Sequence, residues 1–292
     1  MSFSVVLRDG GRSRRVSYLL LGPKNGRLVL LANSLLANYH MWDPFVDELI
    51  AAGFRVLRYD QPGHGWSTAP ADPSVTTFET LSEDVFGLLK MLQIQKVYAW
   101  VGISMGAATG VFFVANHPGV VERLVLCDTI TCAPQHAGVP DVFAARVELA
   151  KTQDDAIATL TEQTLARWFS ESWRQANPDE TDRMRQLMRT TTKEGFIACC
   201  HALQHDSFHL GPHLKKIGAG VEAALLVVGE QDANLPETMA AMRDEIQAGF
   251  GDKSTVGWAV IKGAGHVPVI DGREQFSKEV LGFLKQPAKS EA

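Results

Sequence analysis

Short apolar segments rich in β-branched residues alternate with longer amphipathic segments along most of this chain, and no other feature constrains its fold as strongly. Several apolar segments contain no charged residue, as expected for strands that helices cover on both faces of a parallel sheet. The expected strands are Val16–Leu21, Leu28–Ala32, Phe54–Tyr59, Val97–Val101, Leu124–Cys127, Ala224–Val228 and Trp258–Ile261. The expected helices lie near Met41–Ala52, Thr77–Leu92, Met105–Asn116, Pro236–Ala248 and Glu274–Lys285. The pattern predicts an α/β fold with a mainly parallel, doubly covered sheet.

The N-terminal segments Phe3–Leu7 and Val16–Leu21 flank Asp9-Gly10-Gly11, a sequence typical of a tight turn. We therefore expect these two segments to pair as an antiparallel hairpin. With the hairpin included, the predicted sheet has eight strands.

The alternation stops between residues 133 and 218, where helical spacing and polar turns replace the strands. Leu160–Trp173 and Glu180–Thr192 are the clearest helical segments there. Ligands of open α/β sheets bind at the carboxyl ends of the strands, so an insertion at that edge would cover the site. We predict a core of residues 1–132 and 219–292 with a helical lid of residues 133–218.

Composition excludes several classes of protein. The chain has 292 residues, a formal net charge of -5 and 21% charged residues, which argues against a nucleic-acid-binding surface. It has no apolar run of membrane-spanning length and no signal-peptide pattern near its start, so we expect neither membrane association nor export. The cysteines at 127, 132, 199 and 200 include an adjacent pair, which favours reduced thiols in a cytoplasmic protein.

The segment Gly102-Ile103-Ser104-Met105-Gly106 lies between the expected strand Val97–Val101 and the expected helix that follows. A serine on such a strand–turn–helix junction is held in a strained, exposed turn, and the flanking glycines allow neighbouring backbone to approach. The helix N-terminus beside it favours developing negative charge. Ser104 is therefore the predicted nucleophile.

A nucleophilic serine needs a base and an orienting carboxylate. His266 lies in the loop between the last expected strand and the last expected helix, and Asp232 directly follows the strand Ala224–Val228. The chain order serine, acid, histidine is the one expected around a nucleophile of this type. Asp128, which follows the strand Leu124–Cys127, and Glu230 remain alternatives for the acid.

Two backbone amides are expected to bind the oxyanion. Met105 follows the nucleophile and supplies one, and the loop after Leu28–Ala32 supplies the other, from Leu35 or alternatively Ser34. The turn Asp60-Gln61-Pro62-Gly63-His64-Gly65 is interpreted as structural, and we expect no catalytic role for His64.

Histidines 201, 205, 209 and 213 recur every fourth residue, a spacing that on one helix would place them on a shared face. Gly211-Pro212 is expected to interrupt any helix before His213. We therefore expect lid histidines without a metal, and no cofactor elsewhere.

Over nearly its whole length the sequence resembles the α/β-hydrolase fold family, and within it the 3-oxoadipate enol-lactonases (β-ketoadipate enol-lactone hydrolases). The matching core segments are Asn33-Ser34-Leu35 with His40-Met41-Trp42-Asp43, and Arg58-Tyr59-Asp60 through Gly63-His64-Gly65 and Ser67. The matching lid segments are Arg167-Trp168-Phe169, Glu194-Gly195-Phe196 and Ala198-Cys199-Cys200. The chain has Leu36-Ala37 where these enzymes are expected to have a glycine after the leucine.

The resemblance implies a cytoplasmic enzyme that opens a small lactone without a metal or organic cofactor. It implies that Arg167 pairs with the carboxylate carried by the lactone and that Trp168 covers the ring, unless both are ordinary lid residues; we also expect Ser34 to contact substrate. A carboxylesterase, a lactonase for a larger natural product, a C–C bond hydrolase and a non-catalytic ligand-binding protein remain alternatives. Homo-oligomerisation is left open.

Overall fold

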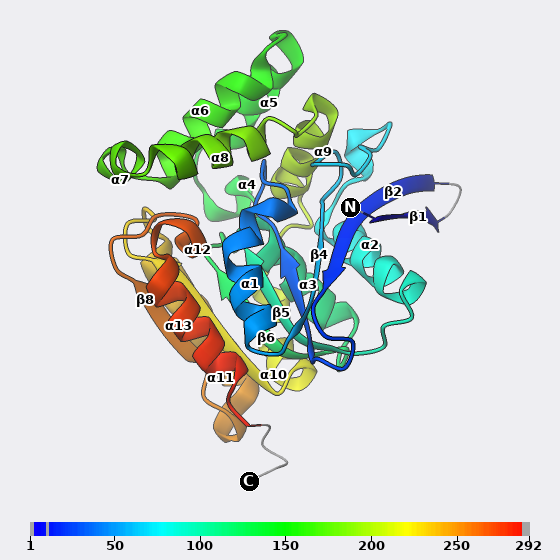
Figure 1. The fold of residues 1–292 in the computed structure, drawn as a ribbon. Helices are drawn as coiled ribbons and strands as arrows, with labels where there is room; N and C mark the ends of the chain where they lie inside the picture. Colours follow the sequence, from blue (N-terminus) through cyan, green and yellow to red (C-terminus); the bar gives the residue numbers. More distant parts are fainter. Residues whose placement is uncertain (1–2, 10–11, 288–292) are drawn as a thin grey trace.

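The computed structural model describes residues 3–9 and 12–287, and an eight-stranded sheet runs through its centre (Figure 1). The strand order is β1-β2-β4-β3-β5-β6-β7-β8. The strands are β1 (Phe3–Asp9), β2 (Arg12–Leu21), β3 (Leu28–Ala32), β4 (Arg55–Tyr59), β5 (Val97–Ile103), β6 (Val121–Cys127), β7 (Ala223–Gly229) and β8 (Gly257–Ile261). The predicted fold class is confirmed.

The direction of pairing changes once across this sheet. β1 and β4 each pair with β2 in antiparallel fashion, and every pairing from β4 to β8 is parallel. The expected hairpin of β1 and β2 is present, although its turn residues Gly10 and Gly11 lie outside the described residues. Every residue of β3 and β5 is buried, which explains why these strands are apolar throughout.

Helices cover both faces of the sheet (Figure 1). On one face α1 (Asp43–Ala51) contacts β4 and α13 (Arg273–Leu284), and α13 contacts β7 and β8. On the other, α3 (Met105–Asn116) packs on β5 and β6 between α2 (Phe78–Met91) and α10 (Gly211–Gly220), and α11 (Leu235–Phe250) packs on α10. The predicted helix at Met41–Ala52 is divided into a 3-10 turn (Tyr39–Trp42) and α1.

The lid segment, defined here as residues 133–218, contains the helices between β6 and the returning helix α10. These are α4 (Pro134–Ala137), α5 (Val142–Thr152), α6 (Ala156–Trp168), α7 (Glu171–Ala176), α8 (Pro178–Met188) and α9 (Lys193–Gln204). The group α5 to α8 projects beyond one edge of the sheet at the top of Figure 1. Within the described ranges, no helix is long and apolar enough to cross a bilayer.

Two predicted lid helices were wrong in their extent. In each case the helix ends early, and a side-chain cap starts a new helix a few residues later. Leu160–Trp173 is interrupted where Phe169 is extended and the Ser170 hydroxyl caps α7 by accepting from the Trp173 amide at 3.2 Å. Glu180–Thr192 ends at Met188, and the Thr192 hydroxyl caps the next helix by accepting from the Gly195 amide.

A close backbone approach fixes α3 against the centre of the sheet. A Cβ atom added to Gly106 would lie 2.3 Å from the carbonyl oxygen of Ala32 at the end of β3. One added to Gly102 would lie 2.4 Å from the carbonyl oxygen of Gly106. Both distances are far below contact, so the helix N-terminus can sit this close to β3 and β5 only if both residues are glycine.

We predict that Gly106→Ala destabilises the protein by more than about 2 kcal/mol, because backbone atoms must move to admit the new methyl group. Gly282→Ala is the matched control: a Cβ at this α13 position meets nothing within 4 Å, and alanine favours a helix by about 1 kcal/mol over glycine. Urea unfolding of both variants measures the two effects. Equal stability of the two variants would contradict the close approach described for α3.

Candidate active site

Ser104 lies at the carboxyl end of β5, directly before α3, in a strained backbone conformation. Its φ of 56° and ψ of -117° fall in a region that L-residues rarely adopt. The backbone holds this geometry through the Ser104 amide, which donates to the Cys127 carbonyl on β6 at 2.8 Å. The turn leaves the Ser104 side chain partly exposed at the N-terminus of α3, where the helix dipole favours negative charge.

The structure brings His266 to Asp232 and to neither of the alternative acids. His266 Nδ1 lies 2.6 Å from Asp232 Oδ2, and both side chains are almost fully buried. Glu230 is exposed and accepts a hydrogen bond from the Gly263 amide. Asp128 lies behind Asp232, where its Oδ1 accepts from the Gly229 amide at 2.8 Å.

The environment keeps the imidazole neutral and the carboxylate charged. Burial lowers the pKa of His266 below its ordinary value, although Asp232 opposes this effect. Burial alone would raise the pKa of Asp232, but the charge and hydrogen bond of His266 leave it lowered. With Nδ1–H donated to Asp232, the Nε2 lone pair is available, and this buried atom has no hydrogen-bond partner among the described residues. His266 is thus arranged as a base.

A cavity of about 520 Å³ opens beside Ser104 and His266. Ser34, Leu35 and Met105, predicted from sequence, line it together with Arg167. The backbone amides of Leu35 and Met105 donate to no protein group that the structure describes, and the buried Ser34 hydroxyl also has no described partner. Two free amides and a free hydroxyl beside a serine are the arrangement expected of an oxyanion site. A hollow of about 770 Å³ between β1 and α2 contains none of the predicted site residues.

The loop after β3 is held by buried side chains from the next turn of the chain. Leu36 has a φ of 68°, a left-handed conformation that favours glycine. Its amide donates to Nε2 of His64 at 2.9 Å, while His64 Nδ1 donates to the Pro62 carbonyl. Burial lowers the pKa of His64 to about 4, so the ring stays neutral and accepts. His64 therefore supports the loop that carries Leu35.

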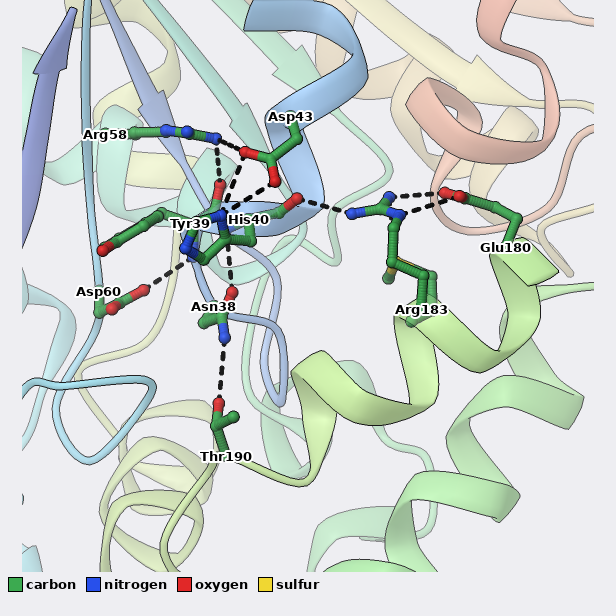
Figure 2. Close-up of polar contacts among 10 residues, drawn as sticks. Asn38, Tyr39, His40, Asp43, Arg58, Asp60, Glu180, Arg183 and Thr190 are labelled. Atoms are coloured by element: carbon green, nitrogen blue, oxygen red, sulfur yellow. Dashed lines mark hydrogen bonds and ion pairs between the residues drawn. The ribbon is translucent and has the colours of Figure 1, made fainter. Parts of the chain in front are cut away.

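The lid segment is tied to the same loop by hydrogen bonds. Asn38 Nδ2 donates to Thr190 Oγ1 at 3.0 Å, and Arg183 on α8 donates to the His40 carbonyl at 2.8 Å (Figure 2). Thr191 adds a bond from its hydroxyl to the Leu36 carbonyl at 3.1 Å. The candidate oxyanion loop is therefore fixed from the core side and from the lid side.

Trp168 lies against the loop that carries His266 and is not among the residues lining the cavity. Its ring centroid is 5.5 Å from that of His266, and its carbonyl accepts from the His266 amide at 3.2 Å. A Cβ on Gly265 would lie 2.1 Å from the same carbonyl oxygen. In this geometry Trp168 packs against the loop that carries His266.

The four periodic histidines do not form a metal site. His201 lies on α9, and His205 directly follows the end of that helix. The backbone of His209 pairs with that of Cys132 in an isolated antiparallel β-bridge, and His213 lies on α10. Among the described residues, no group of three or more metal-ligating side chains is close enough to hold an ion. The helix ends at Gln204, before the Gly211-Pro212 interruption predicted from sequence.

Sequence reasoning missed one residue that lines the cavity. Arg146 on α5 lines the cavity, but it lies in a lid helix with no motif around it. His64 was assigned to a structural turn, and only its position opposite Leu36 reveals that it supports the oxyanion loop. Its place between two glycines was the available signal.

We predict that His64 makes stability depend on pH. The unfolded residue titrates near 6.5 and the buried one near 4, so as the pH falls through this window the unfolded chain binds a proton first. The free energy of unfolding should drop by about 3 kcal/mol from this site between pH 7 and 4, and no further below. Denaturant unfolding should show a shallower pH dependence in His64→Gln than in the wild type. The exposed His136→Gln control should follow the wild type; parallel curves for His64→Gln would refute the prediction.

Known proteins share this fold and roughly a quarter to a third of this sequence over nearly its whole length. Residues 27–272 match the family model described as alpha/beta hydrolase fold. The chain is 27% identical over 287 residues to 3-oxoadipate enol-lactonase 1 of Acinetobacter baylyi, covering 97% of each. It is 31% identical to the crystal structure of the enol-lactonase from Burkholderia xenovorans, covering 97% of this chain and 100% of that one at a TM-score of 0.80.

A crystal structure of a hydrolase from Pseudomonas aeruginosa is 26% identical, with a TM-score of 0.80 and coverage of 97% and 98%. These matches confirm the resemblance derived from the sequence. The chain is an enzyme and belongs to the alpha/beta hydrolase fold family.

Proposed function

We propose that this enzyme opens a small enol-lactone that carries a carboxylate, 3-oxoadipate enol-lactone or a related compound, through an acyl-enzyme on Ser104. The observation that carries the proposal is a pair of cations, Arg167 and Arg146, lining the same cavity as Ser104 and His266. Two relatives named as enol-lactonases support this substrate class.

The two arginines have no acidic partner among the described residues that would neutralise their charge. Neither forms an ion pair or side-chain hydrogen bond with any residue in the described part of the chain. Arg167 is exposed and Arg146 is partly exposed, and both line the cavity. Burial and the charge of Arg146 lower the pKa of Arg167 to about 10, so it remains charged at neutral pH.

Two unpaired positive charges in a largely apolar cavity favour a ligand that brings its own negative charge. The cavity volume of about 520 Å³ suits a small molecule. A lactone with an acid side chain satisfies both conditions, since its carboxylate meets the arginines while its ring carbonyl reaches Ser104.

In the proposed acylation step, Ser104 Oγ attacks the lactone carbonyl as His266 Nε2 takes the hydroxyl proton. Asp232 stabilises the imidazolium through Nδ1. The amides of Leu35 and Met105 bind the tetrahedral oxyanion. Collapse breaks the ring C–O bond, and His266 returns the proton to the departing enol oxygen, which stays attached to the acyl group.

In the deacylation step, water attacks the serine ester as His266 removes its proton, and Ser104 leaves as the alcohol. The product carries a new carboxylic acid and an enol that converts to the ketone. Each step needs only the groups already described, so the proposed reaction consumes the lactone and one water.

We predict that Ser104→Ala lowers kcat/KM for the enol-lactone by about 10⁴-fold or more, because the nucleophile is lost. The variant should also escape labelling by a fluorophosphonate, as judged by intact mass. Cys132→Ala is the matched control, since this cysteine lines the same cavity. It should keep near-normal activity. Substantial lactone hydrolysis by Ser104→Ala would refute the proposed nucleophile.

We predict that Arg167→Gln and Arg146→Gln each weaken recognition of the carboxylate, raising KM roughly 10- to 100-fold. Steady-state kinetics should be compared for the carboxylated enol-lactone and for the same ring bearing a methyl group in place of its acid side chain. The neutral lactone should change little. Lys151→Gln removes one positive charge from an exposed site on the same helix as Arg146 and serves as the control. Equal losses on both lactones would contradict the role assigned to the arginines.

The same measurements separate the alternative reactions. Preference of the wild type for short neutral esters would indicate a carboxylesterase. Preference for large lactones or for carbon–carbon cleavage would change the proposed substrate class. Ser104 would remain the proposed nucleophile.

A further inference from the structure

Asp128 is a buried carboxyl that the proposed reaction does not use. It follows β6, is 0% exposed, and is absent from the cavity lining. Its φ of 43° turns the chain sharply at the strand end, and its amide donates to the Val227 carbonyl on the neighbouring β7. The side chain is therefore fixed behind the site, out of reach of a substrate.

Its two oxygens have different surroundings. Oδ1 accepts a hydrogen bond from the Gly229 amide at 2.8 Å. Oδ2 is buried and receives no N–H or O–H from any other described group, but the carboxyl lies within hydrogen-bonding contact of Asp232. An acceptor facing another acceptor is stable only if one of them carries a proton.

The charges around the two carboxyls decide where that proton sits. Asp232 faces His266, with the charge of Arg167 adding to the attraction, so its ionised form is favoured. No cation among the described residues acts on Asp128; burial and the charges of Asp232 and Asp271 all raise its pKa well above the ordinary value. The preceding residue carries the Cys127 thiol, whose pKa is also raised by burial, and the charges of Arg167 and Arg146 act on His266. Two adjacent buried carboxyls cannot both ionise, so the proton belongs on Asp128.

We propose that Asp128 is a neutral carboxylic acid that donates its hydroxyl proton to the carboxylate of Asp232 and so positions that carboxylate against His266. Asp128 touches neither substrate nor reacting atoms, which makes it a positioning residue. Asp232 then receives Nδ1–H of His266 on Oδ2 and the Asp128 hydroxyl in addition. Its orientation is fixed by two donors instead of one.

The proposal also predicts how the imidazole titrates. A hydrogen bond from Asp128 draws negative charge from Asp232 and so limits how strongly Asp232 stabilises the imidazolium. Removing that donor should raise the pKa of His266 and move the acidic limb of the pH–rate profile upward. If Asp128 were instead a second carboxylate, neutralising it would move that limb downward.

The test compares Asp128→Asn and Asp128→Ala with the wild type in pH profiles of kcat/KM. Asparagine can accept from the Gly229 amide and donate an N–H to Asp232, so the acidic limb should stay in place and activity should remain within about threefold. Alanine removes the donor, so the limb should move upward and kcat/KM should fall roughly 10-fold. A downward shift in Asp128→Asn, or equal losses in the two variants, would overturn the proposal.

A second measurement does not depend on turnover or on the alanine variant folding. The infrared difference spectrum of the wild type minus Asp128→Asn at pH 8 should contain the C=O stretching band of a protonated carboxylic acid. Carboxylate bands in its place would overturn the proposal. The kinetic arm rests on the proposed hydrolysis; if the wild type opened no lactone or ester, the proposed function would fail while the infrared band still reported the proton on Asp128.

Discussion

The contact between the N-terminus of α3 and the ends of β3 and β5 is the constraint on which the site depends. Gly102 and Gly106 have no side chains, and this lets the helix approach the carbonyl of Ala32 more closely than any other residue would allow. The strain that results is concentrated at Ser104, whose positive φ is held by a hydrogen bond to β6. The middle of the sheet fixes the position of Ser104. The loops after β3, β7 and β8 then place Leu35, Asp232 and His266 around it.

Charge changes from positive to negative with depth around that point. Arg146 and Arg167 line the cavity, neutral His266 lies beneath it, and ionised Asp232 lies behind the histidine. Such a column is stable in a poorly solvated site because each group faces one of opposite or neutral character. The two arginines are the exception, since they repel each other, and this repulsion supports the proposal that an anionic substrate completes the arrangement.

The sequence predicts those parts of the molecule that are encoded by local signals. The buried strands are apolar without interruption, and Ser104, Asp232 and His266 each follow a strand, so their meeting at one edge follows from the topology. The lid segment has no comparable signal. New helices begin there at the N-caps Ser170 and Thr192, and a periodic apolar pattern that runs through a cap does not reveal it. The positions of Arg146 and Trp168 also depend on lid packing, for which the sequence carries no local signal.

The contacts of the lid segment connect the proposed carboxylate site to the loop that carries His266. Trp168 accepts a hydrogen bond from the His266 amide, and Thr191 donates to the carbonyl of Leu36, next to the proposed oxyanion donor. Arg167, the proposed carboxylate ligand, immediately precedes Trp168 on α6. A substrate anion that orders Arg167 therefore acts on the same helix end that holds the histidine loop. Binding energy from the carboxylate can in this way be used to fix His266 for the chemical step, which is how interactions remote from the reacting bond increase a rate.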